Sequence, residues 1–113
     1  MLRSRRFLAA LCVAFGVACA SPTLPLPPPS IPSSSQVDAN HYALSSTAGV
    51  EANALVILYN KNPDLPLDQR VFGAQADGKG SWSQTIIATK GDAIDITQEF
   101  GSTKSPPTTI QIE

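Results

Sequence analysis

Few side chains in this 113-residue sequence could do chemistry, and they do not group into a reaction centre. His41 is the only histidine, and no strained Gly-x-Ser-x-Gly turn supplies a nucleophile for it. Asp92 and Asp95 are three residues apart on an expected strand, so they point to opposite faces and do not form a paired acid–base site. We therefore expect no catalytic residues, no cofactor and a protein that is not an enzyme.

Residues 77–80 read Asp-Gly-Lys-Gly and could be a fragment of a calcium-binding loop. Calcium needs several converging oxygen ligands, and Lys79 stands where a further acid would be needed. We interpret the four residues as the turn of a β-hairpin and expect no metal site.

Trp82 is the only tryptophan, and an exposed tryptophan could stack on a sugar. It follows the expected turn directly and shares a strand face with Ile86, which favours a place in the core. We predict that Trp82 packs with Leu55 or Ile57 and with Ile86 and Ile94.

The longest polar loop of the expected domain covers residues 60–69. Loops on a rigid sandwich are where binding usually resides. The candidate binding residues are therefore Asn60, Lys61, Asn62 and Asp64, against the alternative that the loop is a tolerated surface excursion.

The N-terminus has the pattern of an export signal. Three arginines within the first six residues precede an apolar run over residues 7–18, which is too short to remain as a membrane-spanning helix. Two cleavage sites fit the small residues that follow. Cleavage after Ala20 suits ordinary signal peptidase, whereas Gly-Val-Ala-Cys at 16–19 resembles the lipobox of bacterial lipoproteins, in which the cysteine is acylated and becomes the first mature residue.

A proline-rich segment follows the signal and holds six prolines between residues 21 and 35. Such a segment cannot form a helix or a central strand, so it is expected to be an extended spacer with a reach of about 40 Å. A spacer directly after Cys19 could hold a domain away from a membrane, which favours lipidation. We therefore expect a signal peptide over 1–18 and a disordered tether over 19–36, or else a disordered tail on a secreted protein.

The remaining residues, 37–113, are enough for one small domain. Both cysteines precede it, at 12 and 19, so the domain has no disulfide and no thiol nucleophile. Removal of the three signal arginines leaves five basic against nine acidic side chains, a net charge of −4. An acidic domain without a basic cluster argues against a nucleic-acid partner and against electrostatic docking on anionic lipid.

The domain alternates short β-forming segments with turns, and no segment has helical periodicity. The segment 54–59, Ala-Leu-Val-Ile-Leu-Tyr, is nearly all apolar and is expected to be a central strand that is buried on both faces, or close to it. The other expected strands alternate, and they cover residues 41–45, 70–76, 81–87, 93–100 and 108–112. About six or seven strands at regular spacing predict a single all-β antiparallel sandwich.

Four segments resemble bacterial immunoglobulin-like domains: 54–60 (Ala-Leu-Val-Ile-Leu-Tyr-Asn), 76–83 (Ala-Asp-Gly-Lys-Gly-Ser-Trp-Ser), 91–97 (Gly-Asp-Ala-Ile-Asp-Ile-Thr) and 105–110 (Ser-Pro-Pro-Thr-Thr-Ile). In that family Phe is common where Trp82 stands. The resemblance implies an immunoglobulin-like β-sandwich without catalytic residues. The whole chain looks like a small envelope lipoprotein of a Gram-negative bacterium.

These features imply a non-enzymatic, lipid-anchored module that contacts an unknown protein or glycan at the cell envelope. Its expected place is the outer membrane, because Ala20 and not Asp follows Cys19. The alternatives are an accessory subunit that positions a larger envelope complex, or an unlipidated immunoglobulin-like domain that is secreted or periplasmic.

Overall fold

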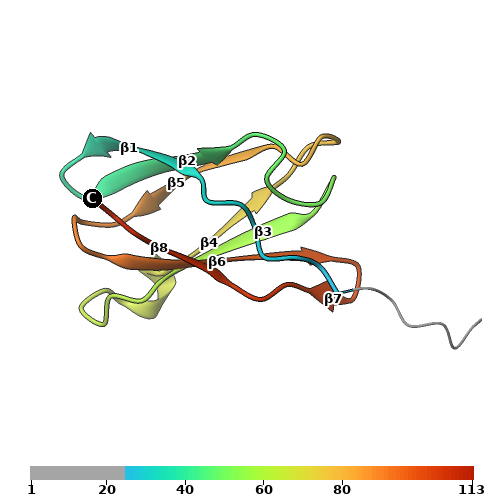
Figure 1. Cartoon of the computed structure of the whole chain (residues 1–113). Helices are drawn as coiled ribbons and strands as arrows, with labels where there is room; N and C mark the ends of the chain where they lie inside the picture. The colour runs from blue at the N-terminus through green and yellow to red at the C-terminus, as the bar shows by residue number, and fades with distance from the viewer. Residues whose placement is uncertain (1–24) are drawn as a thin grey trace, which may run out of the picture.

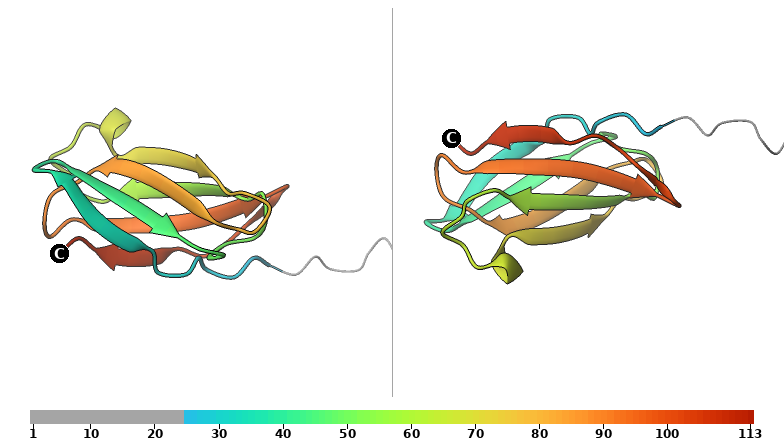
Figure 2. Two further views of the ribbon diagram at one scale, coloured as in Figure 1. Left: turned by 90° about the horizontal axis from the view of Figure 1, so that it is seen from above. Right: turned by 90° about the horizontal axis from the view of Figure 1, so that it is seen from below.

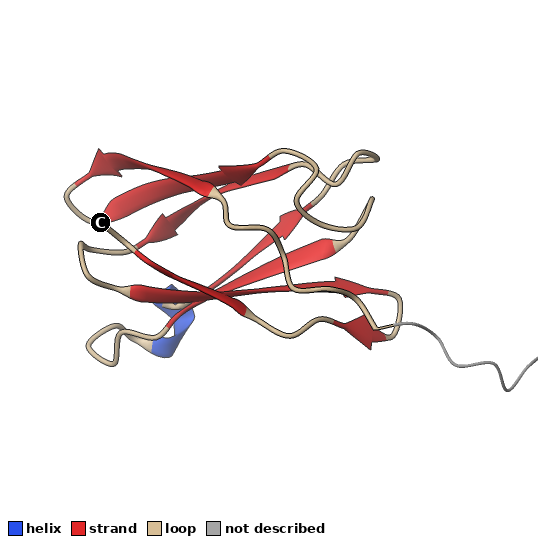
Figure 3. Cartoon of the chain, in the orientation of Figure 1, coloured by secondary structure: helices blue, strands red, loops and turns tan. Residues whose placement is uncertain are grey.

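The computed structural model describes residues 25–113, which form two antiparallel β-sheets packed face to face (Figure 1). In this part of the chain the helical structure is one 3-10 turn, η1 (Figure 3). The elements are β1 (Ser33–Asp38), β2 (His41–Ser46), β3 (Leu55–Asn60), η1 (Leu67–Gln69), β4 (Val71–Gln75), β5 (Trp82–Ile87), β6 (Ala93–Phe100), β7 (Thr103–Lys104) and β8 (Thr108–Gln111). The predicted all-β antiparallel sandwich is confirmed.

The first sheet has the strand order β1-β2-β5, and the second begins β4-β3-β6. Both β7 and β8 pair with the far side of β6. The chain passes between the sheets three times, after β2, β4 and β5, so connections at both ends of the sandwich join the two layers (Figure 2). No helix among residues 25–113 is long and apolar enough to cross a membrane.

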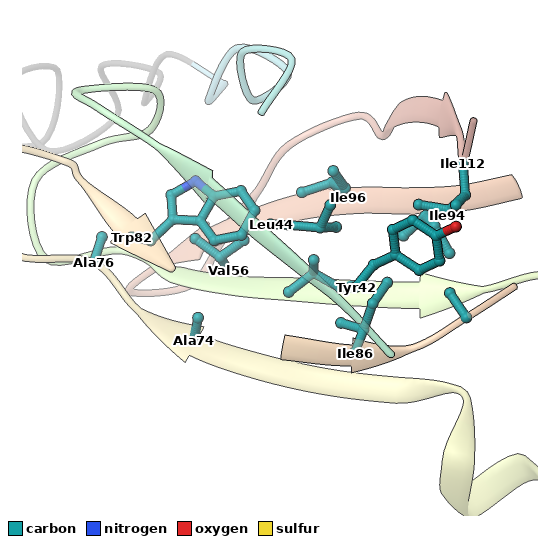
Figure 4. Packing of buried hydrophobic residues seen from close by; sticks show 12 residues of the cluster. Tyr42, Leu44, Val56, Ala74, Ala76, Trp82, Ile86, Ile94, Ile96 and Ile112 are labelled. Atoms are coloured by element: carbon teal, nitrogen blue, oxygen red, sulfur yellow. The ribbon is translucent and has the colours of Figure 1, made fainter. Parts of the chain in front are cut away.

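The core lies between the sheets and follows the alternation predicted for most strands. Tyr42 and Leu44 of β2 and Ile94 and Ile96 of β6 all point inward and are buried. One cluster joins the two sheets, and its members are Tyr42, Leu44, Val56, Leu58, Ala74, Ala76, Trp82, Ile86, Ala88, Ile94, Ile96 and Ile112 (Figure 4).

Strand β3 differs from its prediction, because it is buried on one face only. Val56 and Leu58 point into the core, whereas Leu55 is 41% exposed and Ile57 and Tyr59 are half-buried. The strand is central within its sheet, between β4 and β6, but no layer formed by residues 25–113 covers the outer side of that sheet. The apolar run therefore predicted correctly that β3 is central in its sheet, but it did not mean that both faces of the strand are buried.

Trp82 lies in the core as predicted and is 4% exposed. Its neighbour from β3 is Val56 (Figure 4), whereas the expected partners Leu55 and Ile57 lie on the outer face. In a run of apolar residues the sequence does not reveal which alternate side chains of β3 point into the core, and the structure places Val56 and Leu58 there. The indole Nε1 is buried and has no hydrogen-bond partner within residues 25–113.

The turn at residues 77–80 forms, but it does not close a hairpin. Strand β4 pairs with β3 and strand β5 pairs with β2, so the turn passes the chain from one sheet to the other. The Asp77 carboxylate accepts hydrogen bonds from the backbone of Lys79 and Ser81 at 2.9 and 3.0 Å. These local bonds determine the reversal of the chain, whereas the choice of pairing partner depends on contacts with the rest of the sandwich.

Where the sequence predicts a disordered tether through residue 36, the structure places residues 25–36 in the fold. Residues 33–36 belong to β1, which pairs with β2. The segment 25–32, here called the strap, runs beside β8 (Figure 2), and the backbone N–H of Ser30 donates to Gly49 O at 2.9 Å. Prolines are excluded from a central strand but not from an edge, where their carbonyl groups still accept hydrogen bonds. The expected signal and residues 19–24 lie outside the described residues.

Candidate functional site

Three connections meet at one end of the sandwich and enclose a pocket of about 390 Å³. They are the β1–β2 turn, the loop over residues 60–70 and the turn after β5, all at the left of Figure 1. We call this cavity the loop-end pocket, and its lining residues are Asn40, His41, Asn62, Leu65, Gln69, Ile87, Ala88, Thr89 and Asp92. Its volume lies within the range of small-ligand sites.

Asp92 joins two of these connections. Its buried carboxylate accepts hydrogen bonds from the side-chain amides of Asn60 and Asn62 at 2.9 and 3.0 Å. It also accepts one from the backbone N–H of Thr89 at 3.0 Å. The Asp92 side chain therefore helps to fix the loop over residues 60–70 to the turn after β5.

The surroundings of Asp92 favour its charged form. Burial alone would raise its pKa, but hydrogen bonds from Asn60, Thr89 and Asn62 outweigh burial and hold the pKa of Asp92 below the ordinary value. Because each carboxylate oxygen already accepts two hydrogen bonds, the charge of Asp92 holds the site together and is not offered to a ligand.

Two of the predicted binding residues shape the loop from within. Asn60 is 1% exposed, and its side-chain amide also donates to Ile87 O at 3.0 Å. The Asn60 side-chain oxygen accepts from the backbone N–H of Asn62 at 2.9 Å. Asn62 in turn accepts from the backbone N–H of Asp64 at 2.9 Å and also lines the pocket. Asn62 is thus the one predicted binding residue that the structure brings to the pocket.

The other two predicted residues lie on the outside of the loop. Lys61 Nζ is 3.7 Å from Asp95 Oδ2, an exposed ion pair that contributes little to stability. Asp64 is exposed and does not line the pocket. The predicted lipidation residue, Cys19, lies outside the residues that the structure describes.

His41 lines the pocket, although its isolation in the sequence gave no reason to include it. Its Nδ1 is 2.7 Å from Asp38 Oδ1, so Nδ1 carries the hydrogen and Nε2 is left for another partner. Hydrogen bonds from the Asn40 backbone N–H and from His41 lower the pKa of Asp38. The spacing Asp-x-x-His across a turn was the available sequence signal.

Arg70 fixes the far side of the pocket. Its guanidinium donates to Leu65 O at 2.7 Å and to Pro63 O at 2.9 Å, so it bridges the loop from within. Pro63 and Pro66 further restrict the backbone of this loop, so the loop would lose little conformational entropy on binding a ligand. The loop-end pocket is therefore largely preformed.

The lining can hold an uncharged, partly apolar group. As formed by the described part of the chain, the lining contains no lysine or arginine and no Phe, Tyr or Trp. Within residues 25–113 there is no group of three or more His, Cys, Asp or Glu side chains that could hold a metal ion.

Comparison of the chain with protein-family models, with curated proteins and with solved structures finds no match. What the pocket binds must therefore be inferred from its own residues and from its place in the fold.

Proposed function

We propose that the protein is a non-enzymatic, lipid-anchored module of the cell envelope that presents the loop-end pocket to a partner. The observation that carries this proposal is the position of the pocket relative to the N-terminal chain. The described chain begins at the end of the sandwich near β7, whereas the pocket lies at the opposite end (Figure 1).

Strand β6 gives the separation of the two ends. Asp92 of the pocket directly precedes β6, and the side-chain amide of Gln98 near the end of this strand donates to Pro27 O at 2.8 Å. Six residues of extended chain cover about 20 Å. The point at which an N-terminal anchor would join the domain, near Pro27, therefore lies about this far from the pocket, at the other end of the sandwich.

The strap shortens the link between the anchor and the domain. Only six residues, 19–24 with Cys19 included, precede Pro25, the first described residue, so the Cα atoms of Cys19 and Pro25 are at most about 22 Å apart. An acyl group on Cys19 would hold the domain close to the membrane with the loop-end pocket directed away from it. This orientation suits contact with a protein or glycan of the envelope.

The strand order supports an immunoglobulin-like fold. The three-stranded sheet faces a sheet built on β4-β3-β6-β8, and the chain crosses between them after β2, β4 and β5. This arrangement is compatible with the Greek-key sandwich of such domains. In these sandwiches the end loops commonly carry binding, and the loop-end pocket is formed by end loops.

Mass spectrometry of the N-terminus tests the anchor. The full chain is expressed in a Gram-negative host and purified from its membranes, together with Cys19→Ala and Cys12→Ala as the matched control. We expect a first residue Cys19 that carries acyl chains in the wild type and in Cys12→Ala, and loss of membrane attachment in Cys19→Ala. A free N-terminus at Ser21 would contradict the proposed lipid anchor.

The outer face of the second sheet favours another candidate function, that of an accessory subunit in an envelope complex. Leu55, Ile57 and Tyr59 of β3 line this face, beside Val71, which pairs with Tyr59 and is half-exposed. A sheet face of this kind could pack on a larger partner. The test is Val71→Lys: it would release the protein from a membrane complex on a native gel under the subunit hypothesis and leave its migration unchanged otherwise.

A further inference from the structure

The loop-end pocket combines an aliphatic floor with an uncharged polar rim. Ala88 is buried and Leu65 and Ile87 are half-buried, whereas Asn40 and Gln69 are exposed at the edge. The floor suits an aliphatic group, because burial of apolar surface drives such contacts.

The rim offers groups that both donate and accept hydrogen bonds. The hydrogen bonds formed within residues 25–113 leave the side-chain amides of Asn40 and Gln69 without a partner, and His41 Nε2 is free as described above. A carboxamide has one acceptor oxygen and two donor hydrogens, so it matches the C=O and N–H of a peptide group. The rim therefore suits a polypeptide backbone.

Other ligand classes fit the lining less well. An anion would lack a lysine or arginine, and a cation would find the Asp92 carboxylate already occupied by four hydrogen bonds. A sugar would lack the aromatic ring on which sugars usually stack. The aliphatic floor and carboxamide rim together favour a peptide.

The surface around the pocket indicates the charge of that peptide. Residues 64–68 read Asp-Leu-Pro-Leu-Asp, so exposed carboxylates at Asp64 and Asp68 flank Leu65 of the pocket and Leu67, which is 68% exposed. Val37, on the β1 side of the pocket, is a further exposed apolar residue. One base, Lys90, is exposed beside Thr89 of the pocket, so the acidic side chains still predominate and a complementary segment would carry an aliphatic residue with basic residues beside it.

We propose that the loop-end pocket binds a peptide segment of an envelope protein that inserts an aliphatic side chain flanked by lysine or arginine. This inference rests on the proposed binding function and specifies its partner. The flanking charges are exposed, so they contribute to association rate and salt dependence more than to affinity.

The test uses the purified full chain in detergent and an array of synthetic 11-residue peptides. Each peptide has a central Leu, Ile, Ser or Asp with two lysines on each side, and chitin oligosaccharides serve as the glycan probe. We expect binding of the Leu and Ile peptides only, with affinity that falls as salt is raised.

Two leucine variants separate the pocket from general apolar contact. Leu65→Ser removes part of the floor and is expected to weaken binding of the Leu peptide by about tenfold or more. Leu55→Ser makes the same change on the outer face of β3 and is expected to leave binding unchanged. Asn40→Trp, at an exposed rim position, is expected to block the pocket without disturbing the core.

The possible outcomes are distinct. Equal binding by Leu65→Ser and the wild type, or no preference for aliphatic peptides, would overturn the inference. Binding of the oligosaccharide that Asn40→Trp abolishes would also overturn it, while the proposed binding function would stand. Binding of neither probe would count against the peptide inference and against the role of the pocket in the proposed function.

Discussion

At the scale of single residues, Trp82 is the largest side chain of the core and also contains the buried polar atom that is least well accommodated. The indole is 4% exposed, and its Nε1 has no hydrogen-bond partner among the described residues. Burial of the ring stabilises the domain, whereas a buried donor without an acceptor costs about 1–3 kcal/mol.

These two effects lead to opposite expectations for two substitutions. Trp82→Ala is expected to cost about 3–5 kcal/mol, close to the whole stability of a small domain, so the variant should be largely unfolded. Trp82→Phe keeps much of the volume and removes the unpaired N–H, so it is expected to cost much less. Urea denaturation of the two variants measures the difference, and a midpoint of Trp82→Ala near that of the wild type would show that the ring contributes little to the core.

Asp92 leads to a prediction about pH. Its pKa in the folded state lies below its value in the unfolded chain, so its stabilisation is complete above the unfolded value and is lost as pH falls through the folded value. The free energy of unfolding of the wild type should therefore decrease below about pH 4. Asp92→Asn should be less stable at pH 7 and should depend less on pH in this range.

Denaturation midpoints between pH 2 and pH 7 measure this effect. Asp68→Asn, an exposed change of the same kind in the neighbouring loop, is the matched control and should keep the pH dependence of the wild type. A parallel response of Asp92→Asn and the wild type would mean that Asp92 does not hold the loop over residues 60–70.

At the scale of elements, the turn over residues 77–80 depends on one glycine. Gly80 has a φ of +78°, and an added Cβ would overlap the carbonyl oxygen of Val50. Gly78 in the same turn has no heavy atom within 4 Å of such a Cβ. Gly80→Ala is therefore expected to cost about 2 kcal/mol or more, whereas Gly78→Ala should change stability by less than about 1 kcal/mol.

Thermal denaturation of the two glycine variants provides the measurement. Equal melting temperatures would show that the turn relaxes without cost. A large loss confined to Gly80→Ala would show that the connection between the sheets requires its left-handed conformation.

The strap and β1 give the second prediction at this scale. A chain of residues 37–113 loses most of the pairing of β1 with β2 and leaves Gln98, which is 1% exposed, without its acceptor at Pro27. A chain of residues 25–113 keeps both. We expect the shorter chain to unfold at a clearly lower urea concentration, because an exposed edge and an unpaired buried amide both reduce stability.

The comparison of the two chain lengths could also contradict this expectation. If both chains unfold at the same midpoint, the strap lies on the domain without stabilising it, and the tether between a membrane anchor and the domain would be longer than six residues.

At the scale of the whole molecule, the domain is expected to fold by burial alone. Residues 25–113 contain no cysteine, and one core cluster joins the two sheets. The β-type circular dichroism spectrum of this fragment should therefore be unchanged by EDTA and by dithiothreitol. Loss of the spectrum with EDTA would reveal a metal requirement that the described side chains do not indicate.

The sequence by itself determined the local features of this protein. Alternation placed Tyr42, Leu44, Ile94 and Ile96 inward, because side chains of a strand point to opposite faces whatever the partner strand is. The composition of residues 77–80 determined a tight turn, because glycine and aspartate have special backbone and hydrogen-bonding preferences. These properties act over a few residues and can be read from a few residues.

Only the tertiary structure decided how these parts combine. Three features depend on which arrangement of the whole chain buries the most apolar surface. They are the partners of β4 and β5, the docking of the strap and the outward orientation of Leu55. The loop-end pocket belongs to the same class, because His41, Asn62 and Asp92 are far apart in the sequence and come together at the ends of strands from both sheets. Asn60 showed the difference most plainly: a polar residue in a predicted loop became a buried support for that loop, because Asp92 from another turn lies beside it.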